Sequence, residues 1–313
     1  MSLKLKPAIF LLSLIGVGLI VLSAFSDCNG WLQSFAPTAC FSDKNADMLF
    51  VRRLNRAIKP FLSAKTKLSE DDFNWWKRIQ IEHRDFAFYK NTVSKLFEIF
   101  PPVPDLGKAC SERCRTCAVV GNSVNLKGSR YGRLIDYQDV IIRMNFAPTK
   151  GFEEDVGTKT TYRVMYPESA SDLDNSTHLV LFPFKIQDLD WLMKAFTTGF
   201  SGRSYAPLKS KINANKDLVK VINPAFMKYS HMVWLEGKGT YPSTGFMTLI
   251  LALHICDEIH VFGYGADSDE NWSHYFEALE NKNLKTGPHP GQHEYEIIKQ
   301  LADEKTVELH QGS

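Results

Sequence analysis

The chain has 313 residues, of which 44% are hydrophobic, so it is long enough to bury one large core or two small ones. Its formal net charge is only +2 at pH 7, which argues against a nucleic-acid-binding protein built on a basic patch. No long charge run or internal repeat is visible.

The N-terminus carries a long uncharged apolar run, residues 7–25. As a helix it would be roughly 28 Å long, which is close to the thickness of a bilayer core. Lys4 and Lys6 before it and Asp27 after it suit a cytosolic N-terminus and a luminal remainder. We therefore predict a cytosolic tail (1–6) and a transmembrane signal anchor (7–25).

A cleaved signal peptide is the alternative, with Ala24-Phe25-Ser26 as a loose small-x-small site. The run is long for the apolar part of a signal peptide, which favours the anchor. Both interpretations place the rest of the chain beyond the membrane, and we expect a short luminal stem over 26–48 and one catalytic domain over 49–313.

The six cysteines suggest disulfides, because an even number in an oxidising compartment usually pairs. Cys114 and Cys117 form a C-x-x-C motif. A redox motif of this kind should follow a strand and open a helix, whereas this one precedes a predicted strand, which argues against a redox centre. Two glycosylation sequons, at Asn175 and Asn271, agree with luminal exposure.

After the stem, apolar residues at helical spacing predict helices over 47–59 and 85–100, the second ended by Pro101. The pair Trp75-Trp76 between them is expected in the core. From Cys117 onward, strand and helix patterns alternate. Strands are predicted at 118–121, 139–145, 160–167, 178–184, 218–223, 258–265 and 306–310. Helices are predicted at 187–197, 225–236, 244–255 and 293–303.

Near-continuous apolar strands interleaved with helices indicate an α/β fold, a mostly parallel twisted sheet with helices on both faces. Ligands of such folds bind at the carboxyl ends of the strands. At the first strand end stand Gly121, Asn122, Ser123 and Asn125. The G-x-G-x-x-G fingerprint is absent, which disfavours a dinucleotide dehydrogenase. These amides and hydroxyls can bind a nucleotide without adding charge, or simply shape a turn.

A second polar group opens the apolar helix predicted at 244–255. Ser243 and Thr244 stand at its N-cap, and Gly245 lets a ligand approach the backbone closely. Free N–H groups and the partial positive charge of a helix start favour a phosphate here. The alternative is a plain Ser/Thr cap.

Two histidines are candidates for acid–base work. His274 follows a glycine-rich strand end, and His289 lies in a loop crowded by glycine and proline. Either could instead be structural.

A metal site has weak support. Asp267-x-Asp269 fits a divalent-ion motif of nucleotide-sugar transferases, but 172–174 and 188–190 also match it. His289 and His293 are four residues apart, yet the proline and glycine between them spoil a helical zinc pair. We expect no catalytic metal.

The ordered segments together resemble the sialyltransferase family of animals. They run CAVVGNS, IIRMNFAP and DVGTKTT, then NPAF, YPSTG and CDEIHVFGYGAD, then HYFE, and finally His289 with Glu294 five residues on. The resemblance covers about 110–300. The motif sequences are most similar to those of the β-galactoside α2,3-sialyltransferases that act on Galβ1,3GalNAc.

That resemblance implies a type II Golgi membrane enzyme with a Rossmann-like, modified GT-A fold. It implies no metal or other cofactor. The donor would be CMP-sialic acid, and the acceptor a galactose-terminated glycan on a glycoprotein or glycolipid. It also implies a disulfide between Cys117 and Cys256, and a second from Cys40 to Cys114. Cys28 and Cys110 have no clear pairing.

The resemblance further assigns roles. His289 matches the catalytic base, and His274 the histidine that meets the donor phosphate. Tyr241 and Tyr205 match acceptor-facing positions. The nucleotide-contacting positions carry over onto Asn122, Ser123, Asn125, Asn145, Ser243, Thr244, Gly245 and Gly265. Two other functions stay open: an inactive sugar-binding Golgi protein of the same fold, and a metal-dependent transferase using Asp267 and Asp269.

Overall fold

The computed structural model of the chain describes residues 48–104, 114–267, 272–277 and 287–312. Within these ranges no helix is long and apolar enough to cross a membrane. The predicted tail, the span at 7–25 and nearly all of the stem lie outside the described residues.

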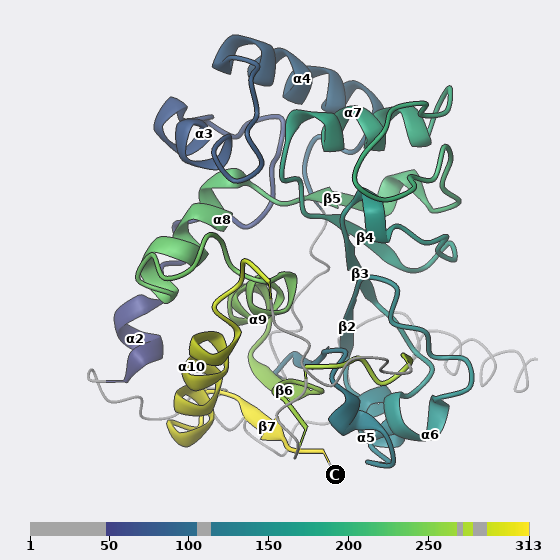
Figure 1. Cartoon of the computed structure of the whole chain (residues 1–313), viewed down its shortest axis with the longest axis vertical. Coiled ribbons are helices and arrows are strands. Elements are labelled where there is room, and N and C mark those ends of the chain that lie inside the picture. The colour runs from purple at the N-terminus through teal and green to yellow at the C-terminus, as the bar shows by residue number, and fades with distance from the viewer. Residues whose placement is uncertain (1–47, 105–113, 268–271, 278–286, 313) are drawn as a thin grey trace, which may run out of the picture.

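Seven strands form one sheet, and each pair of neighbours is parallel (Figure 1). Its order is β5-β4-β3-β2-β1-β6-β7. The strands are β1 (Thr116–Val120), β2 (Val140–Met144), β3 (Tyr162–Met165), β4 (His178–Leu181), β5 (Val219–Val221), β6 (Glu258–Phe262) and β7 (Glu308–His310). Each falls within or beside a predicted strand, so the α/β prediction is confirmed.

The longer helices also follow the apolar periodicity. They are α4 (Phe86–Ile99), α7 (Ile186–Ala195), α9 (Thr244–Ile255) and α10 (Gly291–Asp303). The helix predicted at 225–236 is α8 (Pro224–Tyr229) followed by the π-helical segment η4 (Ser230–Trp234). The helix predicted at 47–59 is wrong in length, because α2 (Leu49–Arg53) ends where Leu54 turns extended.

Several short helices have no counterpart in the sequence prediction, since less than two turns show no clear periodicity. They are α3 (Glu70–Trp76), α5 (Gly132–Tyr137), α6 (Glu153–Val156) and the 3-10 turns η1 (Val124–Leu126), η2 (Pro167–Ser169) and η3 (Lys216–Leu218). Ser69 caps α3 by accepting a hydrogen bond from the Asp72 N–H. Trp76 is fully buried, as expected, and its indole N–H donates to the carbonyl of Pro183.

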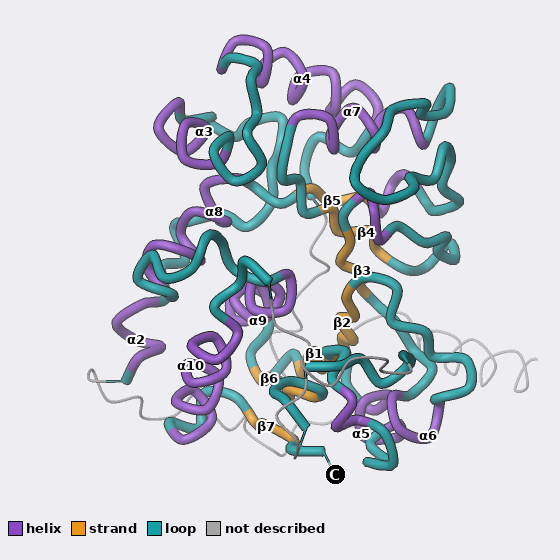
Figure 2. The backbone as a smooth tube through the Cα atoms, in the orientation of Figure 1, coloured by secondary structure: helices purple, strands orange, loops and turns teal. Residues whose placement is uncertain are grey.

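The sheet is covered on both faces, as Figure 2 shows from the helices on either side of the strands. On one face α9, apolar all round and fully buried along most of its length, packs against β1, β2, β3 and β6. On the other face Ile135 of α5 and Val156 of α6 cover Ala118, Val120 and Ile141. Burial on both faces explains why the strands read as unbroken apolar runs.

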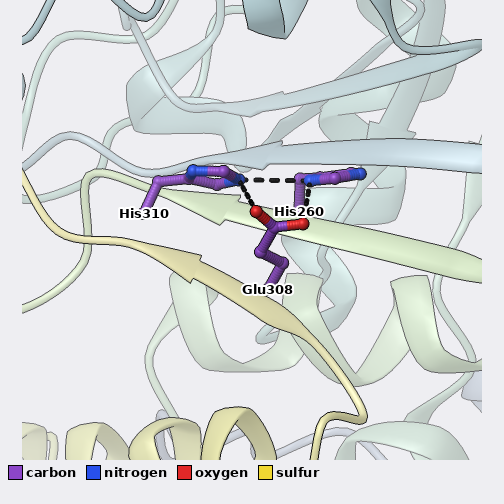
Figure 3. A group of neighbouring side chains, drawn as sticks. All are labelled: His260, Glu308 and His310. Atoms are coloured by element: carbon purple, nitrogen blue, oxygen red, sulfur yellow. Dashed lines mark hydrogen bonds and ion pairs between the residues drawn. The ribbon is translucent and has the colours of Figure 1, made fainter.

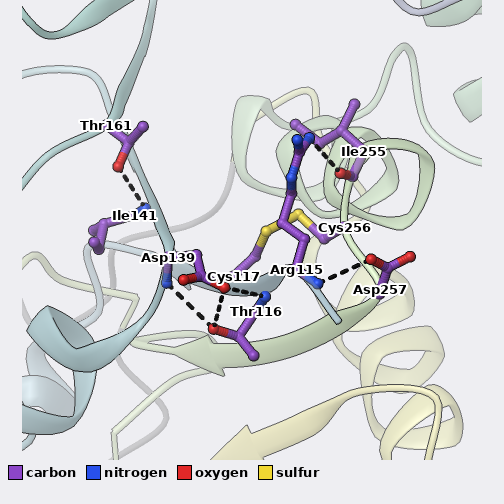
Figure 4. The surroundings of a disulfide bond; sticks show 9 residues. All are labelled: Arg115, Thr116, Cys117, Asp139, Ile141, Thr161, Ile255, Cys256 and Asp257. Carbon is purple, nitrogen blue, oxygen red and sulfur yellow. Dashed lines mark hydrogen bonds between the residues drawn. A yellow bond between two sulfur atoms is a disulfide. The ribbon is translucent and has the colours of Figure 1, made fainter. Parts of the chain in front are cut away.

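A disulfide joins Cys117 in β1 to Cys256, the residue that ends α9, and confirms that predicted pairing (Figure 4). Both cysteines are buried, and the Arg115 N–H beside them donates to Asp257 Oδ2 over 2.9 Å. Cys114 is also disulfide-bonded. Its predicted partner Cys40, together with Cys28 and Cys110, lies outside the described residues.

Of the two predicted glycosylation sites, one lies in the part of the chain that the structure describes. Asn175 is exposed in the connection between β3 and β4, a position open to modification. Asn271 lies outside the described residues.

Candidate functional site

A cavity of about 500 Å³ opens at the carboxyl ends of the central strands. Its wall is built by the residues that follow β1, β2 and β6, together with the amino end of α9 and the start of α10. The sequence-predicted residues that line it are Asn122, Ser123, Asn145, Tyr205, Tyr241, Ser243, Thr244, Gly245, Gly265, His274 and His289. Among the described residues that line it there is no lysine, arginine or aspartate.

The turn after β1 has to be glycine at its first position. A Cβ on Gly121 would lie 2.2 Å from the carbonyl oxygen of Gly263, so only glycine lets the two strand ends approach. The Asn122 amide nitrogen is 3.5 Å from the Met144 carbonyl, and its Oδ1 is buried without a hydrogen-bond partner among the described residues. Asn122 therefore keeps an acceptor for a ligand.

Ser123 and Asn125 of the same turn have structural tasks. Ser123 Oγ accepts a hydrogen bond from the Asn125 N–H, and the Asn125 amide donates 2.9 Å to the Tyr264 carbonyl. Asn125 does not line the cavity.

The segment around His274 lies directly on that turn. Ser123 and His274 form an isolated antiparallel bridge, and the Tyr275 N–H donates to the Asn122 carbonyl over 2.9 Å. His274 Nδ1 lies 2.9 Å from Glu277 Oε2, and its ring stacks on Phe276. Nδ1 is buried beside that carboxylate without meeting hydrogen-bond geometry among the described residues, so Nε2 is the nitrogen left to meet a ligand.

Asn145 occupies the end of β2 in a left-handed conformation, with φ of +55°. The guanidinium of Arg163, largely buried beneath it, donates to the carbonyl oxygens of Asn145 and Ala147 over 3.2 and 3.1 Å. Ser169 Oγ donates to Asn145 Oδ1 over 3.0 Å. These bonds fix both the backbone and the side chain of Asn145. They hold it in a left-handed conformation that residues other than glycine adopt only occasionally.

The amino end of α9 presents donors to the cavity. Ser243 caps it, because its Oγ accepts from the Phe246 N–H over 3.0 Å. The N–H groups of Thr244 and Gly245 have no hydrogen-bond partner among the described residues. Two backbone donors and the positive end of the helix dipole are therefore available to an anion.

Gly245 and Gly265 are glycines for different reasons. A Cβ on Gly245 would meet Tyr264 Cε1 at 3.4 Å and Met144 Sδ at 3.5 Å, which are ordinary contacts. The packing of the fold therefore does not require glycine at position 245. Gly265 instead has φ of +93°, and a Cβ would come within 2.8 Å of the Tyr295 ring.

Glu294 of α10 lines the cavity, a role that the sequence did not predict. In the sequence its spacing from His289 only helped to identify the family. Its two carboxylate oxygens accept hydrogen bonds from the Ser243 N–H over 2.7 Å and the Ser243 hydroxyl over 2.6 Å. The hydroxyl of Ser243 therefore donates to Glu294, and Thr244 is the neighbouring hydroxyl residue that lines the cavity. Burial raises the pKa of Glu294 to about 7, against the opposing effect of the Ser243 hydrogen bonds.

His289 faces the cavity from the loop before α10. Its Nδ1 lies 3.1 Å from the carbonyl oxygen of Tyr241, which only accepts, so Nδ1 carries the proton and neutral Nε2 carries the lone pair. Burial lowers the pKa of His289, opposed by that hydrogen bond. His293, which points to Glu296 with 3.7 Å between Nδ1 and Oε2, does not line the cavity.

An aromatic wall forms another part of the cavity lining. Tyr241 contacts the His289 ring edge-on and packs against Phe184, which in turn contacts Tyr166. Burial raises the pKa of Tyr241, and its hydrogen bond to Gln80 opposes the rise. Tyr205 lines the same side but is 74% exposed. Aromatic faces with hydroxyl and amide groups at their edges suit a sugar.

None of the described aspartates of the Asp-x-Asp motifs lines this cavity. Asp267 does not line it, and Asp269 lies outside the described residues. Asp172 pairs with Lys209, and Asp188 is buried with its carboxylate accepting from the Phe184 N–H. A metal-dependent mechanism gains no support from the described pairs.

Comparisons with known proteins agree with this geometry. A family model described as glycosyltransferase family 29 (sialyltransferase) matches residues 61–306. CMP-N-acetylneuraminate-beta-galactosamide-alpha-2,3-sialyltransferase 1 of Sus scrofa is 42% identical over 279 residues, which are 88% of this chain and 81% of that relative. The corresponding sialyltransferase 2 of Rattus norvegicus is 42% identical over 284 residues, 90% of this chain and 81% of that relative. The crystal structure of a mammalian sialyltransferase in complex with Gal-beta-1-3GalNAc-ortho-nitrophenol superposes with a TM-score of 0.81 at 41% identity, covering 88% of this chain and 98% of that one.

The pKa of Glu294 predicts a specific pH dependence of stability. Because the folded pKa of about 7 exceeds the ordinary 4.5, the stabilising contribution is complete below pH 4.5 and is lost as the pH rises through 7. In Glu294→Gln, whose amide can still meet both groups of Ser243, this loss should vanish. Denaturant unfolding at pH 4.5 and 7.5 should show that the wild type loses on the order of 2–3 kcal/mol more than the variant over this interval. Glu296→Gln, an exposed glutamate of the same helix, is the matched control and should follow the wild type; a Glu294→Gln curve parallel to the wild type would contradict the assignment.

Proposed function

The chain belongs to glycosyltransferase family 29, the sialyltransferases, and we propose that His289 is the base with which it transfers sialic acid from CMP-sialic acid to the 3-hydroxyl of a terminal β-galactose. The chain is an enzyme, a CMP-sialic acid:β-galactoside α2,3-sialyltransferase. One observation carries the assignment of the site: four stretches far apart in the sequence, after β1, at the start of α9, around His274 and at His289, line one cavity.

The donor binds by its nucleotide between the turn after β1 and the amino end of α9. Asn122, Asn145 and Gly265 border the nucleotide, and the Thr244 and Gly245 N–H groups meet the phosphate. His274 adds an imidazole donor from the other side. Negative charge grows on the phosphate as CMP leaves, and a single well-placed donor of this kind is worth about 3–4 kcal/mol in the transition state.

The acceptor lies along the aromatic wall. Tyr241 and Tyr205 face the galactose, and Galβ1,3GalNAc is the proposed acceptor disaccharide because the crystallised relative was solved with it. The galactose 3-hydroxyl attacks the anomeric carbon as the bond to the phosphate breaks, which inverts that centre. His289 Nε2 takes the hydroxyl proton, and the charge that results on the imidazole is stabilised by the Nδ1–H bond to the Tyr241 carbonyl.

We also propose the cellular setting. The N-terminal segment 7–25 anchors the chain in the Golgi membrane as a type II protein, with the catalytic domain of modified GT-A type in the lumen. The sequons at Asn175 and Asn271 and the disulfides suit that compartment.

Two other functions can be separated by experiment. An inactive sugar-binding protein would bind CMP-sialic acid but release no CMP when acceptor is added; the presence of both His274 and His289 at the cavity favours catalysis. A metal-dependent transferase would lose turnover on treatment with EDTA and in Asp267→Asn. We expect both treatments to leave the initial rate of transfer, measured well below the unfolding temperature, within about twofold.

Removal of the base should abolish chemistry but not donor binding. For His289→Ala we expect kcat to fall by about 10²–10⁴, while CMP affinity by calorimetry changes less than about threefold. His293→Ala, four residues along and outside the cavity, is the matched control and should keep normal turnover. Because burial lowers the pKa of His289, the loss of wild-type kcat/KM that reports this histidine should have its midpoint below pH 6.5. Wild-type-like turnover of His289→Ala would refute the role.

The position of Gly245 at the cavity, where a Cβ would make only ordinary contacts, predicts that a substitution affects stability and binding differently. Gly245→Ala should fold with unchanged or higher stability, by up to about 1 kcal/mol, since alanine is the better helix former. Its methyl group would lie among Tyr264, Met144 and Ser243, which line the cavity, so under the proposed binding mode CMP affinity should weaken about tenfold or more. Thermal unfolding and calorimetry on the same sample test both parts; normal CMP binding by a well-folded variant would place the nucleotide elsewhere.

A further inference from the structure

Three metal-ligating side chains meet at the edge of the sheet, away from the catalytic cavity. They are His260 of β6 and Glu308 and His310 of β7, which Figure 3 shows converging over the two neighbouring strands. The register pairs His260 with Glu308, and Phe262 with His310. Because paired residues of parallel strands point to the same face, the backbone itself brings the three side chains together.

The donor atoms form a compact triangle. His260 Nδ1 is 3.1 Å from His310 Nε2 and 3.2 Å from Glu308 Oε2, and His310 Nε2 is 3.6 Å from Glu308 Oε1. Zinc binds histidine nitrogen and carboxylate oxygen at about 2.0–2.2 Å in tetrahedral geometry, which separates two ligands by about 3.3 Å. The two contacts of His260 lie slightly below that value, and the contact of His310 with the other carboxylate oxygen of Glu308 lies slightly above it. We propose that His260, Glu308 and His310 form a Zn²⁺ site.

The surroundings hold these ligands in place. The His310 ring stacks on Phe262 with centroids 4.3 Å apart and planes at 4°, and Tyr131 contacts its edge. The other nitrogen of His260, Nε2, lies 3.5 Å from Glu258 Oε1. A carboxylate behind a ligating histidine fixes its tautomer and raises its basicity, which is the usual outer shell of a zinc site.

The site serves the fold. None of the three residues lines the catalytic cavity, so the inference stands independently of the proposed mechanism. A bound Zn²⁺ would tie β7, the edge strand, to β6, whose end leads to Gly263 and Gly265 at the cavity. A water molecule would complete the tetrahedron, because Glu308 is 63% exposed and leaves the cluster open to solvent.

The test uses the full-length protein, stripped of metal with a chelator that is then removed, and Zn²⁺ alone as the probe. Calorimetry should give a 1:1 complex with Kd in the micromolar range or tighter. At Zn²⁺ concentrations about 100 times Kd, Tm should rise by about 5 °C or more. Co²⁺ in place of Zn²⁺ should give the intense visible absorption of a tetrahedral site.

Variants locate the metal. Glu308→Gln keeps the shape of an exposed side chain and should fold normally, but it should weaken Zn²⁺ binding more than about 100-fold and abolish the Tm shift. Glu258→Ala, behind His260, should weaken binding about tenfold. His83→Gln removes an exposed histidine elsewhere and should bind Zn²⁺ like the wild type.

Two results would overturn the proposal. One is Zn²⁺ binding in Glu308→Gln equal to that of the wild type, which would place the metal elsewhere. The other is no binding at micromolar Zn²⁺, which would mean that the two imidazoles and the carboxylate only share protons.

Discussion

The contact between Ser243 and Glu294 organises the catalytic site. Glu294 accepts from both the N–H and the hydroxyl of Ser243, so α10 is bonded to the cap of α9. The same contact brings α10, and with it the loop that carries His289, against the start of α9. It also places a carboxyl group with a pKa of about 7 at the positive end of α9.

The sheet and the disulfide hold the other end of this arrangement. Cys117 and Cys256 join the start of β1 to the end of α9, while the ends that point the opposite way, Gly121 and Ser243, border the cavity. A cross-link at one end of a packed strand and helix limits how far they can separate at the other. The backbone groups proposed to bind the donor are therefore fixed, and preorganised groups of this kind need little rearrangement when charge develops.

The proposed mechanism divides the cavity lining between two kinds of recognition. It uses amides, hydroxyls, helix N–H groups and His274 for the donor, and Tyr241, Tyr205 and their aromatic neighbours for the acceptor. The hydrogen bond from His289 Nδ1 to the backbone carbonyl of Tyr241 selects the tautomer of the proposed base. In this mechanism Tyr241 both faces the sugar and orients the base, because its backbone carbonyl holds the imidazole that takes the proton.

The sequence by itself determined the seven strands, the long helices and the order of the polar segments, because apolar periodicity and motif order are local properties of the chain. Through the family resemblance it also predicted the pairing of Cys117 with Cys256. It did not determine the roles of Asn125 and Ser243, whose side chains are occupied by Tyr264 and Glu294, nor the meeting of His260 with Glu308 and His310 at the sheet edge. Those depend on which segments the fold brings side by side. The sequence also did not predict short helices such as α3 and α5, since fewer than two turns show no clear apolar periodicity. Only the tertiary structure decided which hydroxyl, which histidine and which glycine face the cavity, because a side chain's partner is set by packing between elements and not by the residues on either side of it.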